Sequence, residues 1–104
     1  MTMGPWALVL IALVACSGTA SSSRYPPRPD GCAVQILEQS PTVPTDNIGT
    51  AHSVCAPEIS KDDCLRELKD QACRLGGDVV WGVPSAPSQV DGRNRWDGRV
   101  AHTR

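Results

Sequence analysis

The sequence predicts a small α+β domain in which one helix packs on an antiparallel sheet, with elements in the order β-β-α-β-β. Three observations predict this class. Residues 60–75 have the capping residues and apolar spacing of a helix, short β-prone runs stand on both sides of it, and four cysteines are spread over residues 32–104. Strands and helices that are segregated around one core are typical of the α+β class. We therefore assign residues 32–104 to one disulfide-stapled domain.

Two strands are expected before the helix. Residues 33–38 (AVQILE) form a short β-rich run, whereas residues 39–47 contain two prolines and an Asp-Asn pair that favour a loop. Residues 48–55 (IGTAHSVC) have the alternation of a strand, in which one face carries Ile48, Thr50, His52 and Val54. The Ala-Pro pair that follows at 56–57 ends this second strand.

The strongest local signal predicts a helix over residues 60–75. Ser60 is a favourable N-cap, and Asp63 stands three positions later, as in a capping box. Acidic residues gather near the start and Arg74 lies near the end, which suits the helix dipole. Gly76 and Gly77 are expected to end the helix, because glycine adopts the left-handed conformation without a Cβ clash. The apolar stripe that would face the sheet consists of Leu65, Leu68, Ala72 and Leu75.

Two further strands are expected after the helix. Residues 78–83 (DVVWGV) are the most β-prone stretch of the chain, and residues 84–92 read as a Pro/Ser-rich loop that ends in an Asp-Gly turn. Residues 95–103 (RWDGRVAHT) alternate between an apolar or small set and a polar set. That pattern is typical of a strand whose sheet is open to water on one face.

The charge balance and the cysteine count restrict the class of protein. Ten basic side chains against 11 acidic ones give a net charge of -1, so the chain lacks the basic stripe of a nucleic-acid binder. Five cysteines are an odd number, and Cys16 stands apart from the other four. An even set of four in an oxidising compartment predicts two disulfides, which a small domain without phenylalanine needs for stability.

Helix geometry restricts how Cys32, Cys55, Cys64 and Cys73 can pair. Cys64 and Cys73 are nine residues apart, or about 2.5 helical turns, so they point to opposite sides of one helix and cannot bond to each other. We prefer the pairs Cys55–Cys64 and Cys32–Cys73, because the first joins a strand end to the first helical turn across a short loop. The pairs Cys32–Cys64 and Cys55–Cys73 remain the alternative.

The N-terminal residues predict a location in the cell envelope. Residues 6–15 form an apolar run of about ten residues, which is the length of a secretory signal and too short to span a bilayer. The run ends in Leu13-Val14-Ala15-Cys16, which resembles the lipobox of bacterial lipoproteins. We therefore expect a signal peptide over residues 1–15 and lipidation of Cys16, with an ordinary signal cleaved elsewhere as the alternative.

Residues 16–31 are expected to act as a flexible tether between the lipid and the domain. Serine, glycine and proline dominate this segment, and a Pro-Pro-Arg-Pro run favours extended geometry. Ser17, rather than an aspartate, follows the cysteine, which is compatible with transfer to the outer membrane of a Gram-negative cell. The expected partners are thus a membrane, through the lipid, and an envelope protein.

Residues 48–83 contain a strand that ends in a cysteine (IGTAHSVC), then a helix that passes through ACRLGG into DVV. Together with the lipobox-like residues and the proline-rich tether, this run resembles the RcsF family of outer-membrane lipoproteins, which sense envelope stress. The resemblance implies an α+β fold, an outer-membrane location and a sensing role. Cys55 matches a family cysteine, whereas Cys64 and Cys73 match none and the family's cysteines after the helix are absent here.

The sequence offers no pattern for catalysis or for a cofactor. It lacks a C-x-x-C pair, a nucleophile elbow and a phosphate-binding loop, and the two Asp-Gly-Arg triplets do not have the spacing of a calcium loop. His52 and His102 read as strand residues rather than ligands. We expect no enzyme, no metal and no cofactor, and a structural or stress-sensing role through protein contacts. The alternatives are a small ligand- or metal-binding periplasmic module and a thiol-redox protein.

Four residues are candidates for contact with a partner. Trp81 and Trp96 stand on the two predicted C-terminal strands, on either side of the Asp-Gly turn, and Arg95 and Arg99 lie near the second tryptophan. Tryptophan and arginine are enriched in binding hot spots. Both rings would instead complete the core if they are buried, so exposure of one ring beside an arginine is the condition for this assignment.

Overall fold

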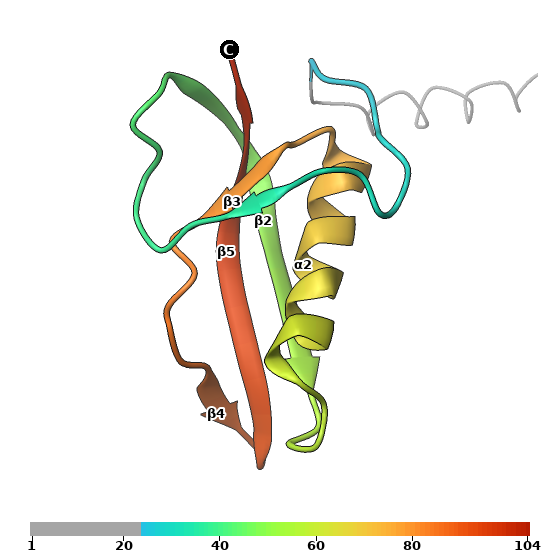
Figure 1. The fold of residues 1–104 in the computed structure, drawn as a ribbon, viewed down its shortest axis with the longest axis vertical. Helices are drawn as coiled ribbons and strands as arrows, with labels where there is room; N and C mark the ends of the chain where they lie inside the picture. Colours follow the sequence, from blue (N-terminus) through green and yellow to red (C-terminus); the bar gives the residue numbers. More distant parts are fainter. Residues whose placement is uncertain (1–23) are drawn as a thin grey trace, which may run out of the picture.

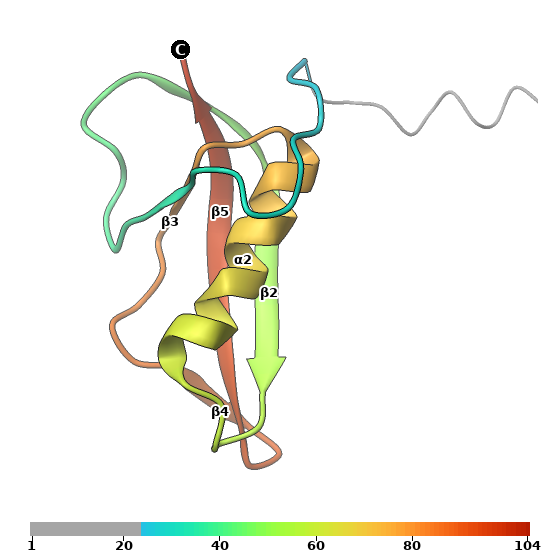
Figure 2. The same ribbon diagram turned by 45° about the vertical axis from the view of Figure 1, so that its right-hand side comes forward.

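The computed structural model describes residues 24–104, and the expectations for residues 1–23, including the signal peptide and lipidation of Cys16, lie outside them. Helix α2 packs against one face of a five-stranded sheet (Figures 1 and 2). The elements in chain order are β1 (Gln35–Ile36), β2 (Thr45–Cys55), α2 (Lys61–Leu75), β3 (Val79–Trp81), β4 (Ser88–Val90) and β5 (Arg93–Thr103). The predicted α+β class, with one helix on a small sheet in this region, is confirmed.

The sheet is mixed rather than purely antiparallel. Its order is β1-β3-β5-β2, and β4 pairs with the lower part of β5. The pairs of β5 with β2, β3 and β4 are antiparallel, but β1 runs parallel to β3 over two residues. β2 and α2 separate β1 from β3 along the chain, so a long connection brings β3 beside β1 in the same direction.

Strand β4 lies inside the segment that was predicted as a loop. Val90 pairs with Arg93 across a two-residue turn, in which Asp91 has φ 51° and Gly92 has φ 74°. Positive φ at both turn residues is the requirement of a type I′ hairpin, which Asp-Gly satisfies. All three residues of β4 are exposed and only Val90 is apolar, so the segment lacks the apolar alternation that marks a strand in the sequence.

Strand β2 has a bulge that changes which residues face the core. It begins at Thr45, three residues before the predicted start, and the register shifts between Asn47 and Gly49. Ile48 packs against the core with Ala51, whereas Thr50, His52 and Val54 are exposed. The predicted alternation of these residues is therefore interrupted at Ile48, because a bulge adds one unpaired residue and reverses the parity.

Helix α2 has the predicted start and end. Ser60 Oγ accepts a hydrogen bond from the Asp63 amide at 3.1 Å, and Gly76 has φ 88° with its amide donating to Cys73 O at 2.9 Å. Leu68 and Ala72 are fully buried, while Leu65 and Leu75 pack at the margin of the core. The core between helix and sheet also contains Ala51, Val80, Val83, Trp96 and Val100.

The disulfides are Cys32–Cys73 and Cys55–Cys64, which is the preferred pairing. Cys64 belongs to the first half of α2 and Cys73 to its last turn, and both are buried. The prediction that these two cysteines belong to different bonds is confirmed. One disulfide joins α2 to the end of β2, and the other joins it to the segment before β1.

Residues 24–31, which we call the strap, belong to the predicted flexible tether but lie against the domain. The Arg28 amide donates to Cys73 O at 2.7 Å and its guanidinium donates to Gly77 O at 2.9 Å. A Cβ at Gly76 would lie 2.6 Å from Tyr25 O, so the strap passes directly over the helix end. The expectation of a free tether therefore does not extend to the strap.

Candidate functional site

The face of the sheet opposite α2 is the surface that the fold leaves available, and we call it the open face. Because side chains alternate along a strand, the exposed residues of β2 and β5 that flank the buried ones point to this side. The open face carries Thr50, His52 and Val54 from β2, Arg95, Asp97 and Arg99 from β5, and Trp81 from β3. Three of the four sequence-predicted partner residues, Trp81, Arg95 and Arg99, thus share one surface.

Trp81 extends across the central strand of the open face. Its Nε1 donates to Asn47 Oδ1 at 3.1 Å, and β5 lies between the strands of these two residues. The ring is half-buried, and the Arg99 guanidinium carbon lies 5.1 Å from the ring centroid, within cation-π range. Ala101, which pairs with Asn47, is fully buried on this side. The indole therefore spans β5 and presents its remaining surface beside an exposed arginine.

Trp96 does not belong to this surface. Its side chain is only 2% exposed and packs in the core between α2 and the sheet, so it does not meet the condition for a partner-binding residue. On β5 it has the same parity as Gly98 and Val100, which face the helix. The Lys61 ammonium lies 5.2 Å from its ring centroid, which is the position of a cation over an aromatic face.

Trp96 also forms one wall of a cavity of about 210 Å³ at the end of the domain where α2 begins. The other lining residues include Ile59, Lys61, Pro87 and the bonded pair Cys55 and Cys64. Lys61 Nζ donates to Ser85 O at 3.2 Å across this region. The cavity can hold a group about as large as one aromatic ring. The Lys61 ammonium at this cavity already contacts Ser85 O and the Trp96 ring.

The charged groups of the open face are partly neutralised. Arg95 Nε contacts both carboxylate oxygens of Asp97, at 3.2 and 3.1 Å, and this hydrogen bonding raises the pKa of Arg95 above its ordinary value. The Arg99 guanidinium lies over the Trp81 ring. Of the two predicted arginines, Arg99 is thus the one beside an aromatic ring, while Arg95 is bonded to Asp97 of the same strand.

A second polar cluster joins the strap to the end of the sheet. Asp46 accepts hydrogen bonds from Tyr25 Oη at 2.6 Å, Arg24 at 2.7 Å and Arg104 at 3.0 Å. The hydrogen bond from Tyr25, followed by those charged neighbours, lowers the pKa of the Asp46 carboxyl although partial burial opposes this. The same hydrogen bond raises the pKa of Tyr25, because it favours the protonated hydroxyl. This cluster holds the strap in place.

The described residues carry neither a metal cluster nor a spanning helix. Within residues 24–104, no three His, Cys, Asp or Glu side chains are grouped so that they would hold a metal ion. The same residues include no helix that is long and apolar enough to cross a membrane. His52 is exposed on the open face, and His102 Nδ1 lies 2.6 Å from Thr103 O in a half-buried position.

Sequence reasoning missed several residues that shape these surfaces. Asn47 was assigned to a loop, yet it fixes the Trp81 ring from a strand 34 positions away. Asp46 accepts hydrogen bonds from three side chains, all of which are more than 20 residues away along the chain. Polar contacts across such separations leave no periodic signal in one sequence, so only the fold reveals them.

Comparisons of the chain with models of protein families, with characterised proteins and with solved structures give no match.

Proposed function

We propose that this protein is a lipid-anchored protein of the bacterial cell envelope that acts through protein contacts and not by catalysis. The main support for the proposal is that four of the five cysteines are bonded in the domain and the fifth lies in the lipobox-like sequence. The domain joins Cys32 to Cys73 and Cys55 to Cys64, so Cys16 is the remaining cysteine of the chain. Cys16 directly follows Leu13-Val14-Ala15 at the end of an apolar run, where a lipoprotein carries its diacylglycerol.

The disulfides support an oxidising compartment as the place of action. Disulfides persist in secreted and periplasmic proteins and are rare in the reducing cytosol. Two of them in a small domain whose largest fully buried side chains are Leu68, Val80 and Val100 fit an exported protein that needs staples. The resemblance to RcsF-type lipoproteins, which covers residues 48–83, favours the outer membrane and stress sensing as the finer proposal.

The open face supports contact as the mode of action. It combines a half-buried tryptophan with an exposed arginine and has no helix over it (Figure 2). Such a ring loses little rotamer entropy for the area that it buries, which is why tryptophan recurs in hot spots. We assign Trp81 and Arg99 as the centre of the partner surface.

Lipidation is tested by expressing the full chain in a Gram-negative host with an alkyne-labelled fatty acid. We expect label on the wild-type chain and a mature mass that begins at a diacylated Cys16, and both are lost in Cys16→Ala. Globomycin, which blocks the lipoprotein signal peptidase, should make the precursor accumulate. Label that survives in Cys16→Ala would contradict the anchor.

The contact surface is tested in the same cells with a photo-crosslinking amino acid in place of Arg99. A discrete adduct is expected at this position and should disappear when Trp81→Ala is added. The matched control replaces Arg66, which is an exposed arginine of α2 on the opposite layer, and should give no such adduct. Equal adducts from both positions would show that the open face is not the partner surface.

A further inference from the structure

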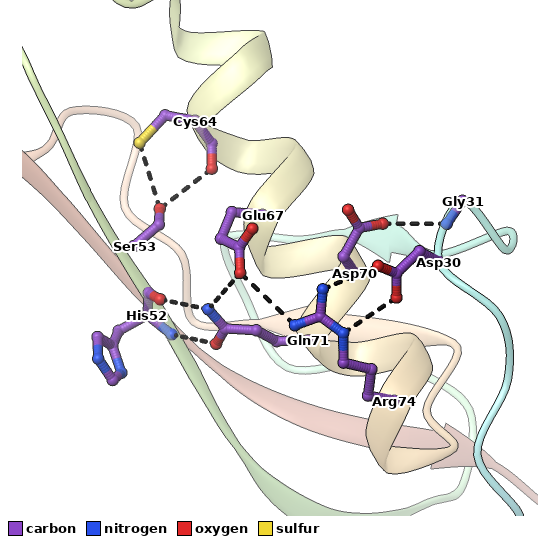
Figure 3. Close-up of polar contacts among 9 residues, drawn as sticks. All are labelled: Asp30, Gly31, His52, Ser53, Cys64, Glu67, Asp70, Gln71 and Arg74. Carbon is purple, nitrogen blue, oxygen red and sulfur yellow. Dashed lines mark hydrogen bonds and ion pairs between the residues drawn. The ribbon is translucent and has the colours of Figure 1, made fainter.

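The outer edge of β2 is occupied by a side chain that takes the place of a neighbouring strand. Gln71 of α2 donates from Nε2 to His52 O at 2.7 Å, and its Oε1 accepts from the His52 amide at 2.9 Å. Figure 3 shows the Gln71 amide lying against the strand backbone at this residue. One primary amide thus satisfies both backbone groups of His52, as a residue of a paired strand does.

The same edge continues on both sides of His52. β2 is the last strand of the sheet order, so its far side pairs with no other strand. Backbone groups of alternate residues point to the same side of a strand, so those of Thr50 and Val54 point outward with those of His52. Both residues are exposed. The edge therefore presents three outward residues, of which Gln71 covers the middle one.

Apart from the Gln71 amide, the edge lacks the residues that usually block strand addition. Residues 50–54 (TAHSV) contain no lysine, proline or acidic side chain, although these are common protections of an exposed edge. The other ends of the sheet are the two-residue β1 and the three-residue β4, which are too short to pair with a long segment. β2 is the one long edge in the described part of the chain.

The charged groups beside this edge are paired with one another. Glu67 accepts from Gln71 Nε2 at 3.2 Å and lies 3.7 Å from the Arg74 guanidinium, which also pairs with Asp30 of the strap. These contacts orient Gln71 toward His52 (Figure 3). An occupant therefore needs a backbone that donates and accepts, and these paired charges favour an uncharged segment.

We propose that the β2 edge from Thr50 to Val54 is a docking site for an extended, uncharged segment of a partner protein, which adds as a strand after Gln71 moves aside. The seated Gln71 amide identifies the chemistry of the occupant as a peptide group. The outward run is short and has α2 beside it (Figures 1 and 2), so it suits a short extended segment of a partner, and addition of a second copy is an outcome of the test.

The test uses the 15N-labelled full chain in mild detergent and a synthetic probe, an acetylated and amidated pentapeptide of alternating threonine and valine. Such residues favour extended strands and carry no charge. We expect the probe to shift the amide signals of Thr50, His52 and Val54 and the side-chain amide of Gln71. Gln71→Ala removes the competing amide and should tighten binding about tenfold, the equivalent of two modest hydrogen bonds.

Two variants and one control complete the test. Val54→Pro removes an outward N–H that β5 does not use, so it should abolish the shifts and keep the fold, and Val54→Lys should do the same by edge charge. Gln89→Ala removes an exposed glutamine that is bonded to Asn94 on β4 and should leave binding unchanged. Because the probe tests the edge alone, its result is independent of lipidation and of the open face.

Three results would overturn the proposal. The first is a set of shifts that maps to other residues, such as those around the Trp96 cavity. The second is binding that Val54→Pro and Val54→Lys leave intact. The third is dimerisation of the Gln71→Ala variant that increases with concentration in sedimentation experiments and is lost when Val54→Lys is added. That result would assign the edge to a second copy.

Discussion

The Tyr25 ring stacks on the His102 ring, with their centroids 3.9 Å apart and their planes inclined by 10°. Tyr25 belongs to the strap and His102 to the last strand, so this contact joins residues that are 77 positions apart along the chain (102 - 25). The strap is therefore fixed to the sheet as well as to the helix end.

Tyr25→Ala is expected to release the first part of the strap and leave the core intact. The substitution removes both the ring stack and the hydrogen bond to Asp46. Hydrogen exchange should become faster at the Arg28 amide, which is bonded to Cys73 O, and stay unchanged at Val100 in the centre of the sheet. Tyr25→Phe, which retains the ring, serves as the matched control and should show the smaller effect.

The attachment of the strap should weaken in acid. The folded pKa of Asp46 is lowered, chiefly by the hydrogen bond from Tyr25, so its contribution to stability is present above the unfolded value of about 3.9. The contribution is lost as the pH falls through the lower folded value. Residue-specific NMR titration of Asp46 and of the Tyr25 ring should show both changing together below about pH 4. In Asp46→Asn, the Tyr25 signal should not change over that range.

The two disulfides should contribute unequally to stability. Cys32 and Cys73 are separated by 41 residues and Cys55 and Cys64 by 9, and the entropy of closing a loop in the unfolded chain rises with its length. Replacement of both cysteines by serine should lower the free energy of unfolding by ~4 kcal/mol for the first pair and ~2.7 kcal/mol for the second. Urea denaturation of the two double variants checks the order, and a larger loss for the shorter loop would contradict the entropic account.

Trp96→Ala should lower the free energy of unfolding more than Trp81→Ala. Trp96 is 2% exposed, so its truncation leaves a core cavity and should cost about 3–5 kcal/mol of unfolding free energy. Trp81 is half-buried on the open face, and its truncation should cost clearly less. Thermal unfolding of the two variants measures the difference. Equal losses would indicate that Trp81 serves the core and would remove it from the proposed partner surface.

Gly98→Ala should destabilise the domain more than Gly49→Ala. A Cβ at Gly98 would lie 2.5 Å from Val80 Cγ1 and 2.7 Å from Val83 Cγ2, and both valines are buried. Overpacking of this kind costs about 1–3 kcal/mol. A Cβ at Gly49 would meet the end of the flexible Leu75 side chain at 2.9 Å, which can move aside. Chemical denaturation of both variants should show the larger shift for Gly98→Ala.

The sequence predicted the parts of the fold that local chemistry determines. Ser60 and Gly76 mark the ends of α2 because capping requires only neighbouring residues. The separation of Cys64 and Cys73 on one helix excluded their mutual bond, and the short loop before Cys64 favoured the one of the two remaining pairings that is observed. The alternation on β5 also placed Trp96 on the same side as Val100, which is the side that faces the core.

The remaining features depend on contacts that no local pattern contains. β4 is exposed at every residue, so only its turn marks it, and the bulge at Ile48 reverses the face of β2 without a change in composition. The strap has the composition of a linker, but Tyr25 and Arg28 find partners on distant elements. The Trp81 surface likewise depends on Asn47, which the loop-like sequence around it concealed.

The position of Cys32 has a mechanical consequence. A pull applied to the chain ahead of residue 24 first loads the strap, and it reaches a covalent cross-link at Cys32, which is joined to Cys73 at the end of α2. The force then passes into the last turn of the helix rather than along β1, because the disulfide diverts it. Of residues 24–73, only the eight strap residues can be drawn out while the bond is intact, because residues 33–72 lie inside the loop that it closes.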